Sequence, residues 1–484
     1  MTEHFGAAAT GNSLTLALDQ GTHSSRAVVF DAHGDLVALG RYPVTLQRHG
    51  RTQVEQSPGE ILASLQAAIE GVFREPGVDP ARIATAGLAT QRSSVLAWDR
   101  NTGAALSPVL SWQDTRTADQ LTALAAHDAD IQQRTGLRLS PHYGAGKIRW
   151  LLENNADVAA ACRAGTLAIG PLASYLLHHL LEGHTNQVDH ANASRTLLWN
   201  LQTGDWDDTL LELFAIPREV LPDCSPVTAS WGNTRNGDIP VTAVNGDQTA
   251  ALYAQARPDT RAIRVNLGTG AFVLLPTGDR CRLLPPLLSG VSRSNSKTGE
   301  YYLEGTVNGA GAAVHWLEQR FDLAGWQQQL PAWLEATRTP PVFLNSIGGL
   351  GSPWWRPGPE PVFLSDKGSI TPAPAEALVA VVESILFLVQ VNIELLCAQE
   401  SGIRHIRIGG GLAQADGVCQ KLANLSGLTV VRGANIEATA RGIAWLAAGQ
   451  PEGWEQTEAT TEFVPQEDTA LGERYARFLV AIKK

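Results

Sequence analysis

Residues 14–30 read Leu14-Thr-Leu-Ala-Leu-Asp-Gln-Gly-Thr-His-Ser-Ser-Arg-Ala-Val-Val-Phe30, two apolar runs joined by a small polar turn. The first run, 14–18, has the length and composition of a buried strand, and it stops at Asp19. Apolar residues resume at 26–30, and the turn Asp31-Ala-His-Gly34 leads into a third run at 36–39. This pattern predicts an antiparallel meander of three strands at the start of the fold.

The next segments indicate that the first half is mixed α/β. Ser57-Pro-Gly-Glu60 has the Ser-x-x-Glu pattern of a capping box, and apolar residues recur at helical spacing over 61–72. Residues 83–88 and 95–98 are predicted strands, the first of which ends at Thr90-Gln-Arg-Ser-Ser94. Strands and helices that follow one another in this way are typical of an α/β fold.

The second half begins the same theme again. A strand at 262–266, the turn Leu267-Gly-Thr-Gly270 and a strand at 271–275 repeat the form of residues 14–30. No exact sequence repeat accompanies this similarity, so we expect an internal duplication at the level of structure only. The other predicted segments are a strand at 241–244, a helix at 249–255, a loop or lid at 340–374, a helix at 375–400, a strand at 405–408 and a helix at about 414–425.

The composition excludes several classes of protein. The chain has 484 residues, enough for two or more domains. Its formal net charge of -11 leaves no basic surplus for a phosphate backbone, so we expect no nucleic-acid partner. The five Cys are an odd number at wide spacings without a Cys-x-x-Cys pair, which is typical of reduced thiols in a cytoplasmic protein.

Neither export nor a membrane partner is expected. Residues 1–13 have no cationic start followed by an apolar block. The apolar stretch 377–398 is long enough to cross a bilayer, but it carries Glu383, Gln390, Asn392 and Glu394. We therefore interpret it as a buried amphipathic helix.

Three small-residue turns each follow a predicted strand: Asp19-Gln-Gly-Thr22, Gly268-Thr-Gly270 and Gly409-Gly-Gly411. Backbone amides in such turns can surround phosphate oxygens, because no bulky Cβ keeps the ligand away. One such turn usually only reverses the chain, but three with hydroxyls and carboxylates attached favour a phosphate ligand. Gly144-Ala-Gly-Lys147 is not a P-loop, since Ile148 stands where the metal-binding hydroxyl is needed.

Two carboxylates, Asp19 and Asp247, stand at the ends of predicted strands. Each by itself could simply cap the turn that follows. As a pair they suit phosphoryl transfer, in which one carboxylate holds Mg²⁺ and another accepts the proton of the attacking hydroxyl. Arg26 could stabilise the developing phosphate charge or could form a salt bridge.

These residues resemble the FGGY family of carbohydrate kinases, and within it the glycerol kinases most closely. The resemblance extends from Leu14 to about Gly449. The matching segments, in chain order, are Asp19-Gln-Gly-Thr-His-Ser-Ser-Arg26, Thr90-Gln-Arg92 with Val95-Leu-Ala-Trp98, Ser111-Trp-Gln-Asp-Thr-Arg116, Asn192-Ala-Ser-Arg-Thr196, Asp205-Trp-Asp-Asp208, Gly246-Asp-Gln248, Gly268-Thr-Gly270 and Gly409-Gly-Gly411.

The resemblance implies an α/β fold of two actin-like (ribonuclease H-like) domains that close on an active-site cleft. Residues 1–250 would form the N-terminal domain, with the acceptor site and the first phosphate loop, and residues 251–484 the nucleotide-binding C-terminal domain, with a C-terminal helix. ATP and Mg²⁺ would be required, the substrate would be a small polyol or sugar, and the protein would be a cytoplasmic homo-oligomer, a dimer or a tetramer.

The resemblance also implies roles for individual residues. Asp247 would be the general base, and Asp19 and Asp247 would hold the metal. Acceptor contacts would come from Arg92, Ser93, Trp112, His142, Asp247, Gln248 and Phe272. ATP contacts would come from Thr22, His23, Ser24, Arg26, Gly268, Thr269, Gly311, His315, Gly411 and Ala415.

The chain departs from the family pattern mainly at the acceptor site. Ser93 replaces a Glu that bonds a hydroxyl of glycerol, and His142 replaces a Tyr unless Tyr143 takes that place by a one-residue shift. Loss of a hydroxyl partner in a buried polar site can cost about 10⁴-fold in discrimination. On the nucleotide side His23 replaces a Thr, His315 a Gln and Ala415 an Asn, changes that matter less where backbone amides bind the phosphates.

These observations predict an ATP-dependent kinase for a terminal hydroxyl of glycerol or of a related small polyol or sugar. The alternative is a kinase of the same family for a ketopentose or a longer polyol such as ribulose, xylulose or erythritol, because Ser93 leaves more space than Glu. A protein of another class, a catalytically inactive nucleotide-dependent sensor on the same fold, would explain the changed nucleotide-side residues.

Overall fold

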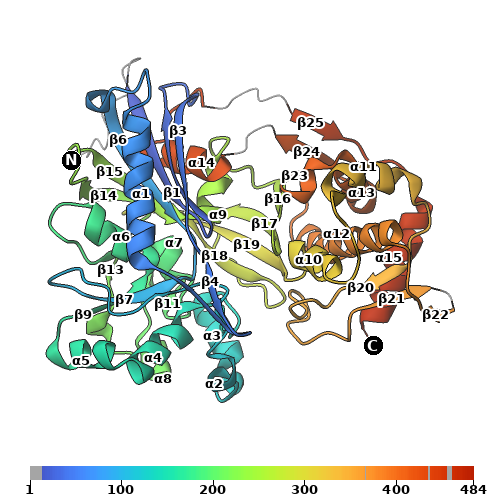
Figure 1. Cartoon of the computed structure of the whole chain (residues 1–484), viewed down its shortest axis with the longest axis horizontal. Helices are drawn as coiled ribbons and strands as arrows, with labels where there is room; N and C mark the ends of the chain where they lie inside the picture. Colours follow the sequence, from blue (N-terminus) through green and yellow to red (C-terminus); the bar gives the residue numbers. More distant parts are fainter. Residues whose placement is uncertain (1–12, 366, 434–436, 455–459, 484) are drawn as a thin grey trace.

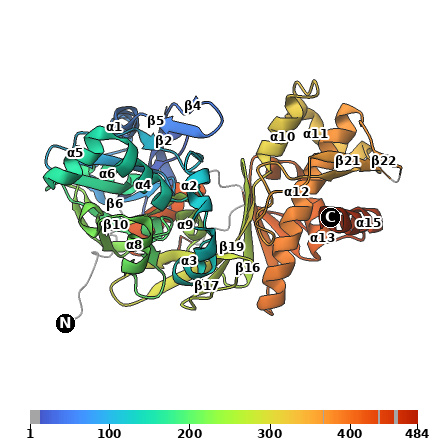
Figure 2. The ribbon, with the colours of Figure 1, turned by 90° about the horizontal axis from the view of Figure 1, so that it is seen from below.

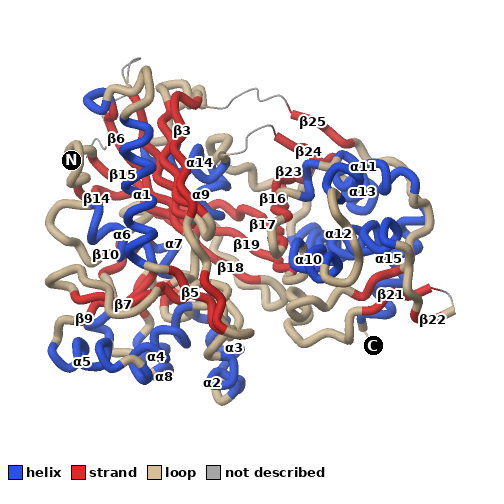
Figure 3. Tube along the Cα trace, in the orientation of Figure 1, coloured by secondary structure: helices blue, strands red, loops and turns tan. Residues whose placement is uncertain are grey.

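The computed structural model describes residues 13–365, 367–433, 437–454 and 460–483, and it contains one large mixed sheet in each half of the chain (Figures 1 and 3). The predicted strands at 14–18, 26–30, 36–39, 83–88 and 95–98 are all present. The two halves lie side by side, with β16, β17 and β19 between them in the view of Figure 2.

The first sheet has six strands in the order β14-β15-β6-β1-β2-β3. Its strands are β14 (Thr228–Asn233), β15 (Pro240–Gly246), β6 (Ile83–Thr90), β1 (Leu14–Gln20), β2 (Ser24–Phe30) and β3 (Leu36–Pro43). The antiparallel pairs β1–β2 and β2–β3 confirm the predicted meander, while β1–β6 and β6–β15 are parallel. Parallel neighbours place their carboxyl ends at the same sheet edge.

The second sheet repeats this pairing. Its seven strands follow the order β18 (Leu288–Ser294), β19 (Gly299–Val307), β17 (Ala271–Gly278), β16 (Ala262–Leu267), β23 (His405–Gly410), β24 (Thr429–Gly433) and β25 (Thr460–Phe463). The pairs β16–β17 and β17–β19 are antiparallel, β16–β23 and β23–β24 are parallel, and β24–β25 is antiparallel, as in the first sheet. The order and directions of the strands therefore repeat between the two sheets, as the two similar hairpins in the sequence predicted. The second sheet has one further edge strand, β18.

Helices and smaller sheets complete each half. The helices of the first half are α1 (Pro58–Phe73), α2 (Ala118–Thr122), α3 (Asp128–Thr135), α4 (Gly144–Asn154), α5 (Ala156–Ala164), α6 (Leu172–Leu180), α7 (His190–Ala193), α8 (Asp208–Phe214) and α9 (Asp247–Ala250). Those of the second half are α10 (Gly311–Glu318), α11 (Trp326–Ala336), α12 (Pro374–Gln399), α13 (Asp416–Ser426), α14 (Ala438–Ala447) and α15 (Thr469–Ile482).

A five-stranded sheet in the first half comprises β4 (Gln47–His49), β5 (Gln53–Gln56), β8 (Val109–Leu110), β7 (Val95–Asp99) and β9 (Leu167–Pro171). Two-stranded pairs are formed by β10 (Gln187–Asp189) with β13 (Asp223–Ser225) and by β11 (Trp199–Asn200) with β12 (Asp205–Trp206).

The predicted start of α1 is correct, but its capping box is only half formed. Ser57 Oγ accepts a hydrogen bond from the backbone amide of Glu60 at 3.3 Å. The Glu60 carboxylate does not bond back to Ser57; it accepts from both the amide and the hydroxyl of Thr45, at 2.9 and 2.7 Å. Glu60 thus ties the helix to the end of β3, and the apolar face of α1 is buried through Ile61, Leu65, Ala68 and Val72.

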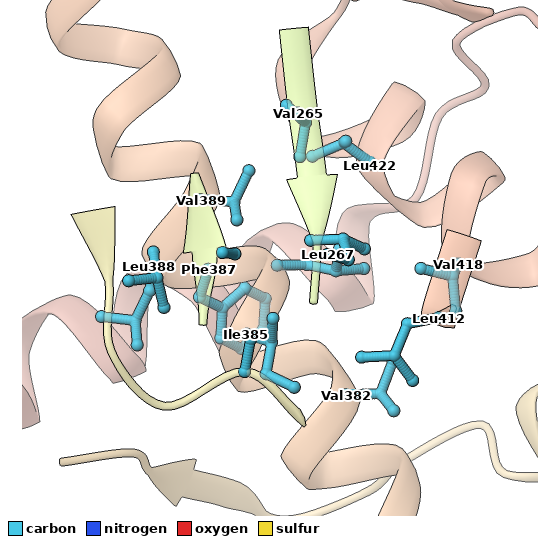
Figure 4. Close-up of a cluster of buried hydrophobic side chains, with 14 of the residues drawn as sticks. Val265, Leu267, Val382, Ile385, Phe387, Leu388, Val389, Leu412, Val418 and Leu422 are labelled. Atoms are coloured by element: carbon cyan, nitrogen blue, oxygen red, sulfur yellow. The ribbon is translucent and has the colours of Figure 1, made fainter. Parts of the chain in front are cut away.

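The long helix α12 forms the centre of the second core, as its polar residues suggested. Figure 4 shows its side chains in one cluster with those of β16 and of the segment around α13. It is long and apolar enough to span a membrane, yet 89% of its most apolar window is buried inside the protein. Its Glu383 is buried and pairs with Lys421 at 2.9 Å and Arg474 at 2.7 Å, which compensates the cost of burying a carboxylate.

One helix of the second half packs against the first sheet. Figure 1 shows α14 with the strands of the first half, where it contacts β1, β6 and β15. The contact is close because Gly87 lacks a side chain: a Cβ there would lie 2.8 Å from Ile443 Cγ1. The predicted division at residue 250 stays a prediction; in space, the chain of the second half returns to the first sheet through α14.

Two local expectations were wrong. The region 340–374, expected as a loop or lid, contains the three-stranded sheet β20 (Val342–Leu344), β21 (Val362–Ser365) and β22 (Gly368–Ser369). Its strands are too short to show a period of two. The helix expected at 249–255 is only the four residues of α9 followed by a 3₁₀ turn, Ala251–Tyr253.

Candidate active site

The carboxyl ends of β1, β6 and β15 bring three predicted site residues to one edge of the first sheet. Gln20 of β1 and Gly246 of β15 are both register partners of Thr90 in β6. Asp19, Arg92 and Asp247 lie within two residues of these positions. Segments far apart in the sequence therefore place two carboxylates and a guanidinium together, in the location where open α/β sheets bind ligands.

Asp19 is buried, at 4% exposure, and is surrounded by charge. Its Oδ2 lies 3.0 Å from Arg26 Nη1, which also lies 3.0 Å from Glu437 Oε2. Burial raises the pKa of Asp19 to about 7; Arg26 opposes this rise, while Asp247 and Glu437 add to it. Arg26 thus forms the salt bridge considered above, and its contact with nucleotide phosphates stays a prediction. The electrostatic effect of Asp247 on Asp19 indicates that the two carboxylates share one site.

Asp247 is the first residue of α9, directly after β15. Its Oδ1 accepts a hydrogen bond from the amide of Gln248 at 2.7 Å and lies 3.8 Å from Arg92 Nε. Burial raises the pKa of Asp247, and the Arg92 charge opposes the rise. A carboxylate whose pKa is raised is a better proton acceptor than an ordinary one, because basicity increases with pKa.

Arg92 is held by a buried hydrogen-bond network that includes residues of the second half of the chain. Arg92 donates to Tyr302 Oη at 2.9 Å, to Glu304 Oε2 at 3.3 Å and to the Gln248 side chain. Arg195 donates to the other oxygen of Glu304 at 3.0 Å. Burial alone would raise the pKa of Glu304, but Arg195 and Arg92 hold it below its usual value, so the carboxylate is ionised.

The predicted site residues do not include Glu304, Tyr302 and Arg195. A signal was present, because Glu304 stands in an otherwise uncharged and mostly apolar run, Tyr302-Leu-Glu-Gly-Thr-Val307. Arg195 lies in the quoted segment Asn192–Thr196, but no feature of the sequence indicated a partner 109 residues away.

The two acceptor-site positions that depart from the family pattern lie beside this network. Ser93 is buried in a left-handed backbone conformation, φ 63°, and its Oγ has no hydrogen-bond partner. The His142 ring lies edge-on to Trp112, with centroids 5.4 Å apart. Burial and the charges of Lys147, Arg195 and Arg92 hold the pKa of His142 well below its usual range, so the imidazole is neutral.

Tyr143 has different surroundings from His142. Its side chain is buried, and the Arg195 guanidinium lies 5.2 Å from the centre of its ring. Burial raises the pKa of the Tyr143 phenol to about 12. Of the two residues, His142 is the one whose ring contacts the predicted acceptor residue Trp112.

The first phosphate turn is attached to the predicted acceptor site. Trp112 Nε1 donates to Thr22 Oγ1 at 2.9 Å, and the Gln56 amide donates to the Thr22 carbonyl at 2.8 Å. His23, next in the turn, is exposed, and Ser24 begins β2. The turn between β1 and β2 therefore has a defined position relative to Trp112.

The second sheet gathers the other two turns at one edge. Leu267 and Gly410 are register partners in the parallel pair β16–β23, so Gly268-Thr-Gly270 and Gly411 emerge next to each other. The amide of Gly311, at the start of α10, donates to the Gly268 carbonyl at 2.9 Å. A Cβ on Gly411 would meet nothing within 4 Å. Phosphate oxygens can therefore approach the backbone of this edge closely at Gly411.

The remaining predicted residues lie around these turns. His315 is exposed on α10 and bonds to Glu318 of the same helix at 3.2 Å. Ala415 precedes α13 and is half-buried against the core. Phe272 is half-buried in β17, where its register partners are Asn266 and Thr306.

The acidic residues of this site are suited to a magnesium ion that is also bound by phosphate. Within the part of the chain that the structure describes, no group of three or more His, Cys, Asp or Glu could hold a metal ion by itself. Mg²⁺ is commonly bound by one or two carboxylates, with water and substrate phosphates as the other ligands. Because the charge of Asp247 raises the pKa of Asp19, a cation bound beside the two carboxylates would stabilise their ionised forms.

Comparison with known proteins places these features in a family. The profile of the FGGY family of carbohydrate kinases, N-terminal domain, matches residues 14–253, and that of its C-terminal domain matches residues 264–450. A glycerol kinase of Xanthobacter autotrophicus is 36% identical over 453 residues, which cover 90% of each chain.

Solved structures share the fold over nearly the whole chain. Glycerol kinase of Plasmodium falciparum, crystallised with ADP, superposes with a TM-score of 0.85 at 24% identity, covering 97% of this chain and 98% of the other. Xylulose kinase of Lactobacillus acidophilus superposes with a TM-score of 0.82 at 19% identity, covering 97% and 96% of the two chains.

Proposed function

Because the chain belongs to the FGGY family of carbohydrate kinases, we propose that it transfers the terminal phosphoryl group of ATP to a terminal hydroxyl of glycerol or of a related small polyol or sugar. The observation that carries the proposal is the placement of Asp19 and Asp247 at the same edge of the first sheet, with Asp247 next to Arg92. The predicted alternative of an inactive sensor would not need two carboxylates to be kept at this edge.

In the proposed mechanism Asp247 accepts the proton of the acceptor hydroxyl as its oxygen attacks phosphorus. Its raised pKa suits this role, and the bond from the Gln248 amide orients the carboxylate. Arg92 and Gln248 bind and orient the acceptor hydroxyls. When bound, Mg²⁺ supplies charge compensation for the phosphates, and Asp19 and Asp247 would hold it.

The nucleotide is proposed to lie across both edges. The turn that contains Gly268 and Thr269 would bind phosphate oxygens, and Gly311 and Gly411 would line the nucleoside pocket. Thr22 and Arg26 would contact the phosphates from the first sheet. Thr22 is bonded to Trp112, which we propose to line the acceptor site. This bond would fix the distance between acceptor and phosphate, and a close, fixed approach of the reacting groups is a large part of phosphoryl-transfer catalysis.

A second candidate function, a kinase for a ketopentose or a longer polyol, is supported by Ser93. Its hydroxyl is buried without a hydrogen-bond partner and could be satisfied by a further hydroxyl of the acceptor. Ser93 also takes less space than the Glu that glycerol kinases carry. The neutral His142 beside Trp112 can donate and accept hydrogen bonds, as a polyol requires.

A coupled ADP-release assay tests both functions. Purified protein with ATP and Mg²⁺ is offered glycerol, erythritol, ribitol, xylitol, D-ribulose, D-xylulose and L-ribulose, with Asp247→Ala as the blank. Turnover with glycerol above all others supports the first function, and turnover only with four- or five-carbon acceptors supports the second. Absence of turnover with every acceptor contradicts both.

Asp247→Asn, which retains the shape of the side chain, should lower kcat by about 10²-fold or more if Asp247 is the base.

Three further properties stay predictions under this proposal. Chelation of Mg²⁺ should abolish turnover and its return should restore it. Size-exclusion chromatography with light scattering should find a homodimer or homotetramer. Fractionation of cells that produce the protein should find it in the cytoplasm.

A further inference from the structure

The segment Gly144-Ala-Gly-Lys147, which is not a P-loop, begins α4 beside the acceptor site. Its glycines permit a close approach to neighbouring segments. A Cβ on Gly144 would lie 3.1 Å from Val95 Cγ1, and one on Gly146 would lie 2.9 Å from Thr117 Oγ1. The first turn of α4 therefore packs directly against the start of β7, which follows Ser93 and Ser94 in the chain.

Lys147 extends from this turn toward the backbone of the acceptor site. The residue is fully buried, and its Nζ donates to the His142 carbonyl at 2.7 Å and to the Ser93 carbonyl at 3.2 Å. Burial lowers the pKa of Lys147 to about 7, with Asp114 opposing the shift. A buried amine is costly unless hydrogen bonds satisfy it, and these two carbonyls are its hydrogen-bond partners.

The conformation of Ser93 explains why its carbonyl needs a partner. A non-glycine residue in the left-handed region is strained, and surrounding contacts must hold it there. Ser93 joins Arg92, whose side chain contacts Gln248 and Glu304, to Ser94, whose Oγ accepts a bond from the Trp112 amide at 3.0 Å. A change at Ser93 would therefore move Arg92 and Trp112 relative to each other.

We propose that Lys147 is a positioning residue for acceptor binding: through the carbonyls of Ser93 and His142 it holds in place the backbone that carries Arg92 and the His142 ring. The inference rests on the proposed function, since it concerns the same acceptor site. Lys147 acts through the backbone and need not touch the acceptor.

Lys147→Met tests this role, because it keeps the length of the side chain and removes the donors. The KM for the acceptor should rise about tenfold or more, as expected for a binding group displaced by a fraction of an ångström, while the KM for ATP stays within about twofold. The matched control is Lys421→Met. Lys421 is mostly buried and loses one bond, to Glu383 at 2.9 Å, but it lies on α13 in the core of the second half. This control should leave both KM values unchanged.

A double-mutant cycle with Ser93→Gly separates positioning from a general loss of stability. Glycine adopts positive φ without strain, so the backbone should need Lys147 less in that background. The penalty of Lys147→Met on acceptor KM should fall to about threefold or less in the Ser93→Gly background. A merely structural lysine would give the same penalty in both backgrounds, and that result would overturn the proposal.

The outcomes distinguish the inference from the proposed function. A wild-type protein without acceptor-dependent ADP formation contradicts the proposed function itself. An active wild type whose Lys147→Met variant keeps its acceptor KM within about twofold contradicts the role of Lys147. If Lys147→Met does not fold, as judged by circular dichroism and thermal unfolding, Lys147→Gln takes its place. It retains polar donors on a shorter chain and should show the same selective rise in acceptor KM.

Discussion

At the scale of single residues, burial makes the charged form of Asp19 costly. Its pKa is raised from 3.8 to about 7, chiefly by burial, so the folded protein binds a proton there that the unfolded chain has already released above pH 4. Stability therefore falls as the pH rises from about 4 to about 7, and the penalty is complete above this window.

Asp19→Asn removes this penalty. The substitution should raise the free energy of unfolding by about 1–3 kcal/mol at pH 8 but not at pH 4, while reducing kcat by about 10²-fold or more. Thermal unfolding at both pH values, without nucleotide or Mg²⁺, measures the difference. The exposed Asp223→Asn serves as control, and a variant that is less stable than wild type at pH 8 would contradict the expectation.

At the scale of elements, α10 packs against the turn after β16, which we propose binds phosphate, only because Gly311 has no side chain. A Cβ there would lie 2.8 Å from the Gly268 carbonyl oxygen and 3.2 Å from Thr269 Cα, so the helix would have to move away from the turn. Gly311→Ala should raise the KM for ATP about tenfold and leave the KM for the acceptor within about twofold, since the predicted acceptor residues other than Phe272 belong to the first half of the chain. Gly472→Ala is the matched control, because a Cβ at that position of α15 meets nothing within 4 Å and alanine favours the helix. Equal effects of Gly311→Ala on both substrates would show that the two edges are not separate binding units. Steady-state kinetics with each substrate varied in turn gives both KM values.

At the scale of the whole molecule, Glu304 links the two halves through Arg92 and Arg195, all three of them buried. Removing one charge from a buried ionic network leaves its partners uncompensated, at a cost of about 3–5 kcal/mol. Glu304→Gln should therefore lower the Tm and also raise the acceptor KM, because Arg92 loses an anchor in the opposite half.

Glu383→Gln is the matched control: its carboxylate is equally buried and also pairs with two cations, Lys421 and Arg474. It should lower the Tm without changing the acceptor KM. If both variants affect KM alike, the change would come from lost stability and not from the link between the halves.

Much of the architecture was predictable because it depends on local patterns. Apolar runs that stop at small polar turns placed β1, β2, β16 and β17, and polar residues within the apolar stretch 377–398 correctly indicated the buried helix α12. The short strands β20 to β22 could not be predicted, since two to four residues are too few to show a period. Among the candidate site residues, Asp19 and Asp247 could be found because each stands at the end of a predicted strand, whereas Arg92 was predicted from the resemblance to the family.

The residues themselves determined the strands, the turns and the carboxylates at their ends, because strand formation, glycine turns and residue chemistry are properties of short segments. Tertiary packing supplied what depends on contacts between distant segments: Glu304 between Arg92 and Arg195, Lys147 under the carbonyls of Ser93 and His142, and α14 against the first sheet. The physical reason is that burial and charge compensation act through space. A lysine or a glutamate is written the same way in the sequence whether its side chain is exposed or buried, and only the fold decides between these surroundings.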